Sequence, residues 1–175
     1  IDPLQQNKDR ILTLEGGCNF RDIGGYTTAQ GQLVKRGQVV RAGRLSYITE
    51  RDHDALQALG IRAICDLRRA EERQKEPTRW RDNTAHALHW DDQLELPTLR
   101  SYAAQRPSTA EGMFAAMIDL YRGLPLRMHA RIHGLLTCIA NDRVPVLVHC
   151  AAGKDRTGVA IAVLLALLDV PRDTI

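Results

Sequence analysis

Long hydrophobic runs are missing from this sequence. Its 175 residues are 44% hydrophobic and 26% charged, which is ordinary for a globular protein. A membrane-spanning helix needs about 20 consecutive apolar residues, and the longest apolar run, Val159–Leu168, is too short for that. We therefore expect no transmembrane segment. The length and composition predict a single domain over residues 1–175 with a core of its own.

An excess of charge of one sign is also missing. The 24 Lys and Arg residues nearly balance the 21 Asp and Glu residues, for a formal net charge of +3. We therefore expect no nucleic-acid partner, because such proteins have basic residues in clear excess. Of the 24 basic residues, 20 are Arg. The planar guanidinium suits phosphate and carboxylate, so this bias is compatible with an anionic substrate, although an Arg-rich surface without function explains it equally well.

Cysteines are few and show no paired spacing. Cys18, Cys65, Cys138 and Cys150 form no Cys-x-x-Cys motif and no zinc-type cluster, which argues against a disulfide scaffold and against a metal site. Cys65 and Cys138 lie within apolar runs, as inert core cysteines do. Cys150 does not, and this sets it apart as a candidate for chemistry.

Strand and helix signals alternate along the chain. The pattern predicts strands at 38–41, 61–67, 85–90 and 144–148, and helices after Thr49 and at 109–120, 127–140 and 157–168. It predicts a loop or helical turn at 68–75 and a long insertion at 91–107. Such alternation indicates an α/β fold with a central, mostly parallel sheet covered by helices on both faces.

The two ends of the sequence indicate native segments outside it. The first residue is Ile1 rather than Met, and Asp173 and Thr174 resemble the cap of a helix that is not completed. We therefore expect a domain truncated at its C-terminus.

The most informative segment, HCAAGKDRTG at residues 149–158, lies where the buried strand meets the last helix. A helix N-terminus has unpaired N–H groups and the positive end of the helix dipole, and so binds anions. These groups would stabilise a thiolate at Cys150. Arg156 can fold back and hold two phosphate oxygens.

The other residues of this segment fit the same site. Small residues at Ala151, Ala152 and Gly153 let the backbone wrap closely around an anion. We expect Thr157 to donate its hydroxyl to the Cys150 thiolate and the buried His149 to pin the loop. Lys154 is not followed by Ser or Thr, so the segment is not a Walker loop. A Cys and an Arg at this spacing arise often by chance, and the strand before and helix after them make the prediction specific.

HCAAGKDRTG resembles the signature loop of the cysteine-dependent protein tyrosine and dual-specificity phosphatases. Asn19–Tyr26, with the sequence NFRDIGGY, and the Asp66-Leu67-Arg68 triplet are similar to the bacterial tyrosine and phosphoinositide phosphatases. The resemblance runs from Cys18 to the end of the chain. It implies a phosphorylated protein or phosphoinositide substrate, no metal or other cofactor, and a location in the cytoplasm or, after export, in a host cell. The oligomeric state is left open.

The resemblance implies a mechanism in which Cys150 attacks phosphorus to form a phosphocysteine and Arg156 holds the phosphate oxygens. The general acid is less clear, because the chain has no Trp-Pro-Asp tripeptide. Asp155 is the first candidate, because the branch resembled here places its acid in the loop. Asp66 is the second and would otherwise orient Arg156. Asp91 and Asp92, after Trp90, are the third.

Further residues are expected around the loop. Asn19 or Asp22 is expected to support it, with Arg21 facing substrate anions. Lys154 is a candidate for binding additional phosphates of a multiply phosphorylated substrate, and a solvated loop lysine is the alternative. Arg41 and Arg44 are candidates for the pocket rim, although simple surface charge explains them better.

Two other functions are compatible with such a loop. One is a rhodanese-type sulfurtransferase, which also places a Cys in an anion-binding loop but needs no general acid. The other is a phosphate- or phosphoinositide-binding module without turnover, although both the Cys and the Arg are present.

Overall fold

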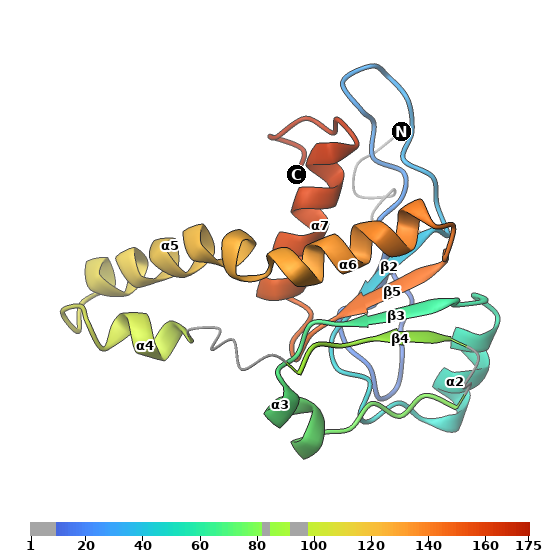
Figure 1. The fold of residues 1–175 in the computed structure, drawn as a ribbon, viewed down its shortest axis with the longest axis horizontal. Coiled ribbons are helices and arrows are strands. Elements are labelled where there is room, and N and C mark those ends of the chain that lie inside the picture. The colour runs from blue at the N-terminus through green and yellow to red at the C-terminus, as the bar shows by residue number, and fades with distance from the viewer. Residues whose placement is uncertain (1–9, 82–84, 92–97) are drawn as a thin grey trace.

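A five-stranded sheet organises the chain (Figure 1). The computed structural model describes residues 10–81, 85–91 and 98–175. The strands stand in the order β1-β2-β5-β3-β4, with β1 antiparallel to β2 and the other neighbours parallel. Their bounds are β1 (Arg21–Asp22), β2 (Val39–Ala42), β3 (Ala63–Asp66), β4 (His86–Leu88) and β5 (Val146–His149).

Helices follow and cover these strands. Their bounds are α2 (Glu50–Gln57), α3 (Ala70–Lys75), α4 (Leu99–Ala103), α5 (Ala110–Arg127), α6 (His129–Ala140) and α7 (Asp155–Leu167). Figure 1 shows α6 lying across the sheet. Helix α5 extends from the start of α6 away from the sheet, toward α4.

Side chains of the strands alternate between two cores, one on each face of the sheet. Val146 and Val148 of β5 belong to a cluster with residues of α5, α6 and α7, such as Leu135. Leu147, between them, belongs to a second cluster that includes Leu56 of α2. Burial on both faces explains why β5 reads as a continuous apolar run. This arrangement confirms the predicted α/β fold with helices on both faces.

Most predicted boundaries differ from the observed ones by one or two residues, β1 was not predicted as a strand, and three further differences follow. The segment 91–107, predicted as an insertion, contains α4, and its residues 92–97 lie outside the described part of the chain. The helix predicted at 109–120 continues to Arg127, because the buried Leu124 extends its apolar face beyond Leu120; Pro125 lies inside this helix. The last helix begins at Asp155, two residues earlier than predicted, since its first turn belongs to the loop.

Three parallel strands end at the same edge of the sheet. Their last residues are Ala42 of β2, Asp66 of β3 and His149 of β5, and both Ala42 and Asp66 pair with His149. The carboxyl ends of parallel strands are where α/β proteins bind ligands. The register therefore brings the chain after β2, after β3 and after β5 together around Cys150.

Candidate active site

The loop between β5 and α7 forms an anion-binding cradle around Cys150. The Cys150 residue is 2% exposed and lies directly after β5. Within the described part of the chain, none of the backbone N–H groups of residues 151–157 donates a hydrogen bond. Successive unpaired N–H groups leading into a helix N-terminus bind oxyanions.

The cradle lies directly against the end of β2. Gly153 has a φ of +68°, and a Cβ atom there would meet the Ala42 oxygen and the Gly43 nitrogen at 2.5 Å each. The Arg44 N–H donates a hydrogen bond of 2.9 Å to the carbonyl of Ala151. Backbone therefore packs on backbone here, which explains why small residues occupy the loop.

The NFRDIGGY segment contacts the loop through Asn19. The Asn19 side chain donates a 2.7 Å hydrogen bond to the carbonyl of Ala152. Asp22 instead accepts hydrogen bonds from the N–H groups of Gly24 and Gly37, and these hold its own turn. Arg21 donates to the backbone oxygen of Asn19 at 3.0 Å. Of the candidates in this segment, Asn19 is the one in direct contact with the loop.

Arg156 is paired with Glu72 of α3, a residue that the sequence analysis missed. The two guanidinium nitrogens of Arg156 each donate a 2.7 Å hydrogen bond to one oxygen of Glu72. Burial acts to raise the pKa of Glu72, but the hydrogen bonds and charge of Arg156 outweigh it and lower that pKa to about 2. Glu72 lies in the first turn of α3 and also accepts a hydrogen bond from the backbone N–H of Arg69, the N-cap residue of this helix. The sequence signal that could have pointed to this partner is the pair of acidic residues, Glu71 and Glu72, in the first turn of the helix after β3.

Asp155 lines a pocket of about 210 Å³ together with Arg69, Thr98, Leu99, Leu120, Leu124 and Arg156. One of its carboxylate oxygens, Oδ1, accepts a hydrogen bond from the hydroxyl of Tyr121 on α5. The Lys154 ammonium lies 3.5 Å from the same oxygen. Burial is the main cause that raises the pKa of Tyr121 to about 12, and the hydrogen bond to Asp155 adds to it. The phenol therefore remains a donor at neutral pH.

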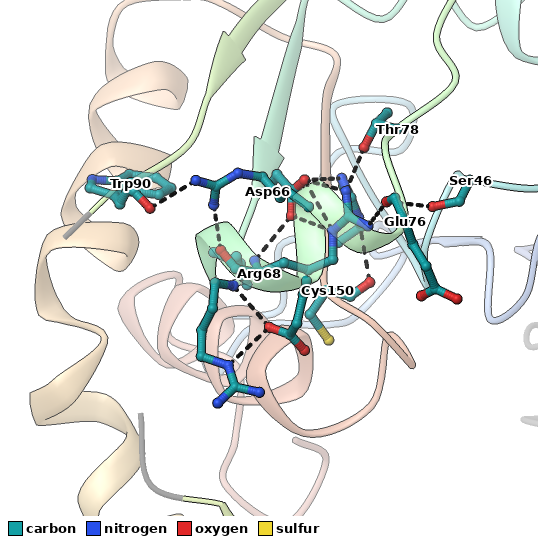
Figure 2. Close-up of polar contacts among 12 residues, drawn as sticks. Ser46, Asp66, Arg68, Glu76, Thr78, Trp90 and Cys150 are labelled. Atoms are coloured by element: carbon teal, nitrogen blue, oxygen red, sulfur yellow. Dashed lines mark hydrogen bonds and ion pairs between the residues drawn. The ribbon is translucent and has the colours of Figure 1, made fainter. Parts of the chain in front are cut away.

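Asp66 is buried in an ion pair with Arg68 rather than with Arg156. Arg68 donates to both Asp66 oxygens, at 2.9 Å and 3.1 Å from Nε and 2.7 Å from Nη2. Burial acts to raise the pKa of Asp66, but these hydrogen bonds and the nearby charges lower it overall. Figure 2 shows Arg68 also reaching the Glu76 backbone and Thr78.

His149 and Thr157 are fully buried beside the cradle. The Nδ1 atom of His149 lies 3.4 Å from the carbonyl of Cys150, and its Nε2 atom lies 3.5 Å from an Asp66 oxygen. Burial lowers the pKa of His149, which favours the neutral ring. The Thr157 hydroxyl makes no hydrogen bond to any described residue, so the expected bond to Cys150 is not formed in this structure.

Asp91, a further candidate for the general acid, follows β4. Asp91 is exposed and forms an ion pair with Arg73 of α3, which also donates to the Trp90 carbonyl at 3.1 Å. Asp92 lies outside the described residues. Arg44, a candidate for the pocket rim, donates to both oxygens of Glu76 at 2.9 Å and 2.7 Å.

Two general features of the described residues bear on function. They contain no group of three or more His, Cys, Asp or Glu side chains placed to hold a metal ion. None of the helices in this part of the chain is long and apolar enough to cross a membrane.

The chain is similar in sequence to known protein phosphatases. A Cupriavidus necator protein assigned as a tyrosine-protein phosphatase is 32% identical over 171 residues, covering 94% of this chain and 60% of that protein. The triple specificity protein phosphatase PtpB of Mycobacterium tuberculosis is 32% identical over 188 residues, covering 94% and 66%. A tyrosine-protein phosphatase of Nostoc commune is 31% identical over 139 residues, covering 76% and 44%.

The chain spans two thirds or less of the length of each of these relatives. The model of the tyrosine phosphatase family matches residues 12–175. This match includes every strand and helix described above, together with the loop after β5. The chain therefore belongs to the tyrosine phosphatase family.

Proposed function

We propose that this domain is a metal-independent phosphatase that hydrolyses phosphotyrosine through a phosphocysteine intermediate. The observation that carries the proposal is the cradle itself. Cys150 lies at its base, the N–H groups of 151–157 make no other hydrogen bond among the described residues, and Arg156 follows in the first turn of α7. A nucleophile surrounded by donors for three phosphate oxygens suits in-line phosphoryl transfer.

The reaction proceeds in two displacements. The Cys150 thiolate attacks phosphorus, so that a phosphorus–sulfur bond forms, the bond to the leaving oxygen breaks, and a carboxylic acid protonates that oxygen. Water then attacks phosphorus and gives its proton to the same carboxylate. The phosphorus–sulfur bond breaks, and inorganic phosphate and the thiolate are released. Arg156 and the loop N–H groups stabilise the equatorial oxygens in both steps.

Geometry favours Asp155 as the general acid. It lines the pocket beside Arg156, and Tyr121 and Lys154 both contact its Oδ1 atom, which leaves Oδ2 to carry the proton. Asp66 is 7% exposed and is held by Arg68. Asp91 is paired with Arg73 of α3. A general acid has to reach the leaving oxygen, and of these three candidates Asp155 is the one that lines a pocket together with Arg156.

Phosphoserine, phosphothreonine and phosphoinositides are proposed as further substrates. One relative is named as a triple specificity phosphatase. The side chain of Lys154 is 68% exposed beside the cradle, where its ammonium can meet a second phosphate. A sulfurtransferase needs no general acid, so that alternative gives no role to Asp155 beside the cradle. The experiment below distinguishes a phosphatase from a binding module without turnover.

The first experiment is initial-rate hydrolysis of a phosphotyrosine peptide and a phosphoinositide panel, with chelator present. We expect turnover by the wild type, loss of turnover in Cys150→Ser, and a rate reduced by about 10²-fold in Asp155→Asn, a typical contribution of a general acid. Cys18→Ser, at an exposed cysteine, is the matched control and should stay active. Wild-type levels of activity in Cys150→Ser would refute the mechanism, and phosphate binding without turnover would indicate a binding module.

The same assay tests Lys154. Lys154→Ala should reduce phosphoinositide turnover more than phosphotyrosine turnover, because only the former substrate has additional phosphates for the ammonium. An equal reduction for both substrates would contradict this role.

A further inference from the structure

The backbone carbonyls of residues 151–154 all accept hydrogen bonds, and that of Lys154 accepts its shorter one, of 2.7 Å, from the Gly158 N–H in α7. The Arg44 N–H donates to Ala151 O at 2.9 Å, Asn19 Nδ2 donates to Ala152 O at 2.7 Å, and Arg41 Nη2 donates to Gly153 O at 2.8 Å and Lys154 O at 3.4 Å. A peptide unit has its N–H and C=O on opposite sides. A carbonyl held outward therefore turns the N–H of the next residue inward.

Arg41 is the one side chain among the described residues that holds two of these carbonyls. It extends from β2, the strand that pairs with β5. The same Arg41 nitrogen also lies close to Gly158, in the first turn of α7. A Cβ atom at Gly158 would be 3.6 Å from this nitrogen. The guanidinium is thus enclosed between β2, the loop and α7.

Among the residues that the structure describes, no carboxylate balances the charge of Arg41. No ion pair joins Arg41 to an acidic side chain in the described ranges, whereas Arg44, Arg68 and Arg156 all have one. Burial and the nearby Arg21 lower the pKa of Arg41 to about 10, and Cys150 acts in the opposite direction. At neutral pH the guanidinium is therefore a charged group next to the cradle, and an anion in the cradle would balance it.

We propose that Arg41 is a positioning residue of the anion site. It holds the carbonyl of Gly153 outward and adds a longer contact to that of Lys154, so that the N–H group after Gly153 points at the phosphate, and its charge favours a bound dianion. Without Arg41, the peptide after Gly153 can rotate and present its carbonyl oxygen to the phosphate, which replaces an attraction by a repulsion. The Lys154 carbonyl would keep its hydrogen bond from the Gly158 N–H. This inference rests on the proposed function, because it assigns Arg41 to the same site.

The test compares Arg41→Met and Arg41→Lys with Arg62→Met. Arg62 is the matched control, because it is an exposed arginine that donates to the backbone oxygen of Asp142 at 3.0 Å, away from the site. Affinity for inorganic phosphate is measured by calorimetry, and kcat and KM are measured with a phosphotyrosine peptide. The melting temperature reports folding.

We expect Arg41→Met to lose about 10²-fold in kcat/KM, the size of effect that small misplacement of catalytic groups produces, with kcat falling more than KM rises. Phosphate affinity should fall in parallel. Arg41→Lys should be intermediate, because an ammonium keeps the charge but not the fork that reaches both carbonyls. Arg62→Met should match the wild type in both measurements.

Phosphate affinity equal to that of the wild type in folded Arg41→Met, or in Arg41→Lys if the Met variant does not fold, would overturn the proposal. The binding measurement does not depend on turnover. An inactive wild type would therefore refute the proposed function, while the phosphate affinities would still decide the role of Arg41.

Discussion

Gly153 occupies a position where two constraints act on one residue. Its φ of +68° lies in the left-handed region, which costs an L-residue roughly 1 kcal/mol. In addition, a Cβ atom would lie 2.5 Å from backbone atoms of Ala42 and Gly43. Backbone of a buried strand cannot move aside as a side chain can, so the loop itself would have to shift away from β2.

Gly153→Ala should therefore reduce both stability and activity. We expect a loss of at least about 2 kcal/mol in the free energy of unfolding, for backbone strain combined with a steric clash, and weaker phosphate binding. Gly31→Ala is the matched control, because Gly31 also has a positive φ, +78°, but a Cβ there would meet nothing within 4 Å. Chemical denaturation of both variants measures the difference. Equal destabilisation of the two would show that the contact with β2 is unimportant.

At the scale of the elements, α3 is joined to the cradle by the Glu72–Arg156 pair. Both of its hydrogen bonds are 2.7 Å long, and the side chains are 21% and 17% exposed. Such a planar, two-point contact fixes the direction of the guanidinium as well as its distance. The position of Arg156 in the cradle thus depends on where α3 lies after β3.

This pair should make stability depend on pH in the acid range. The pKa of Glu72 falls from its ordinary value of 4.5 to about 2 on folding. The pair therefore contributes to stability above pH 4.5, and the contribution is lost as the pH falls toward 2. We expect the difference in free energy of unfolding between wild type and Glu72→Gln to shrink through this window.

The measurement is urea denaturation at a series of pH values. Glu71→Gln, at the exposed neighbouring position of α3, is the control for removing one carboxylate from the same helix turn. A wild-type-to-Glu72→Gln difference that stays constant from neutral pH down to pH 2 would contradict the prediction.

Over the whole molecule, Arg68 connects segments that the sheet alone does not join. Its side chain is 1% exposed and donates to Asp66 at the end of β3, to the Glu76 carbonyl at 2.7 Å and to Thr78 Oγ1 at 2.7 Å. Its own carbonyl accepts from Arg73, which also reaches Trp90 after β4. Figure 2 shows this network around Arg68. Strands β3 and β4 and helix α3 are thereby held in one arrangement beside Cys150.

Arg68→Met should destabilise the whole domain by about 3–5 kcal/mol, because it leaves the buried Asp66 carboxylate without its partner. Restoring neutrality with the double variant Asp66→Asn/Arg68→Met should recover part of this loss. Arg51→Met is the control, since Arg51 forms an exposed pair with Glu15, its own side chain being 84% exposed, and such pairs contribute about 0–1 kcal/mol. Thermal and chemical unfolding of the three variants test the expectation, which a loss no larger than that of Arg51→Met would contradict.

The sequence by itself determined the fold class and the location of the cradle. Residues such as Leu147, within a continuous apolar run, predicted a strand buried on both faces. The segment around Cys150 predicted an anion site where that strand meets a helix. These features are encoded locally, in the hydrophobic period and in a short run of consecutive residues.

Only the tertiary structure decided which distant residues complete the site. Glu72 is 84 positions from Arg156, and Asn19 is 133 positions from the Ala152 carbonyl that it holds. Arg41 and Tyr121 likewise reach the loop from β2 and α5. The NFRDIGGY segment pointed to Asn19 or Asp22, but no local pattern distinguishes Glu72, Arg41 or Tyr121 from other residues of their kind. The register of the parallel strands brings their ends to one edge of the sheet, and that register arises from packing across the whole chain.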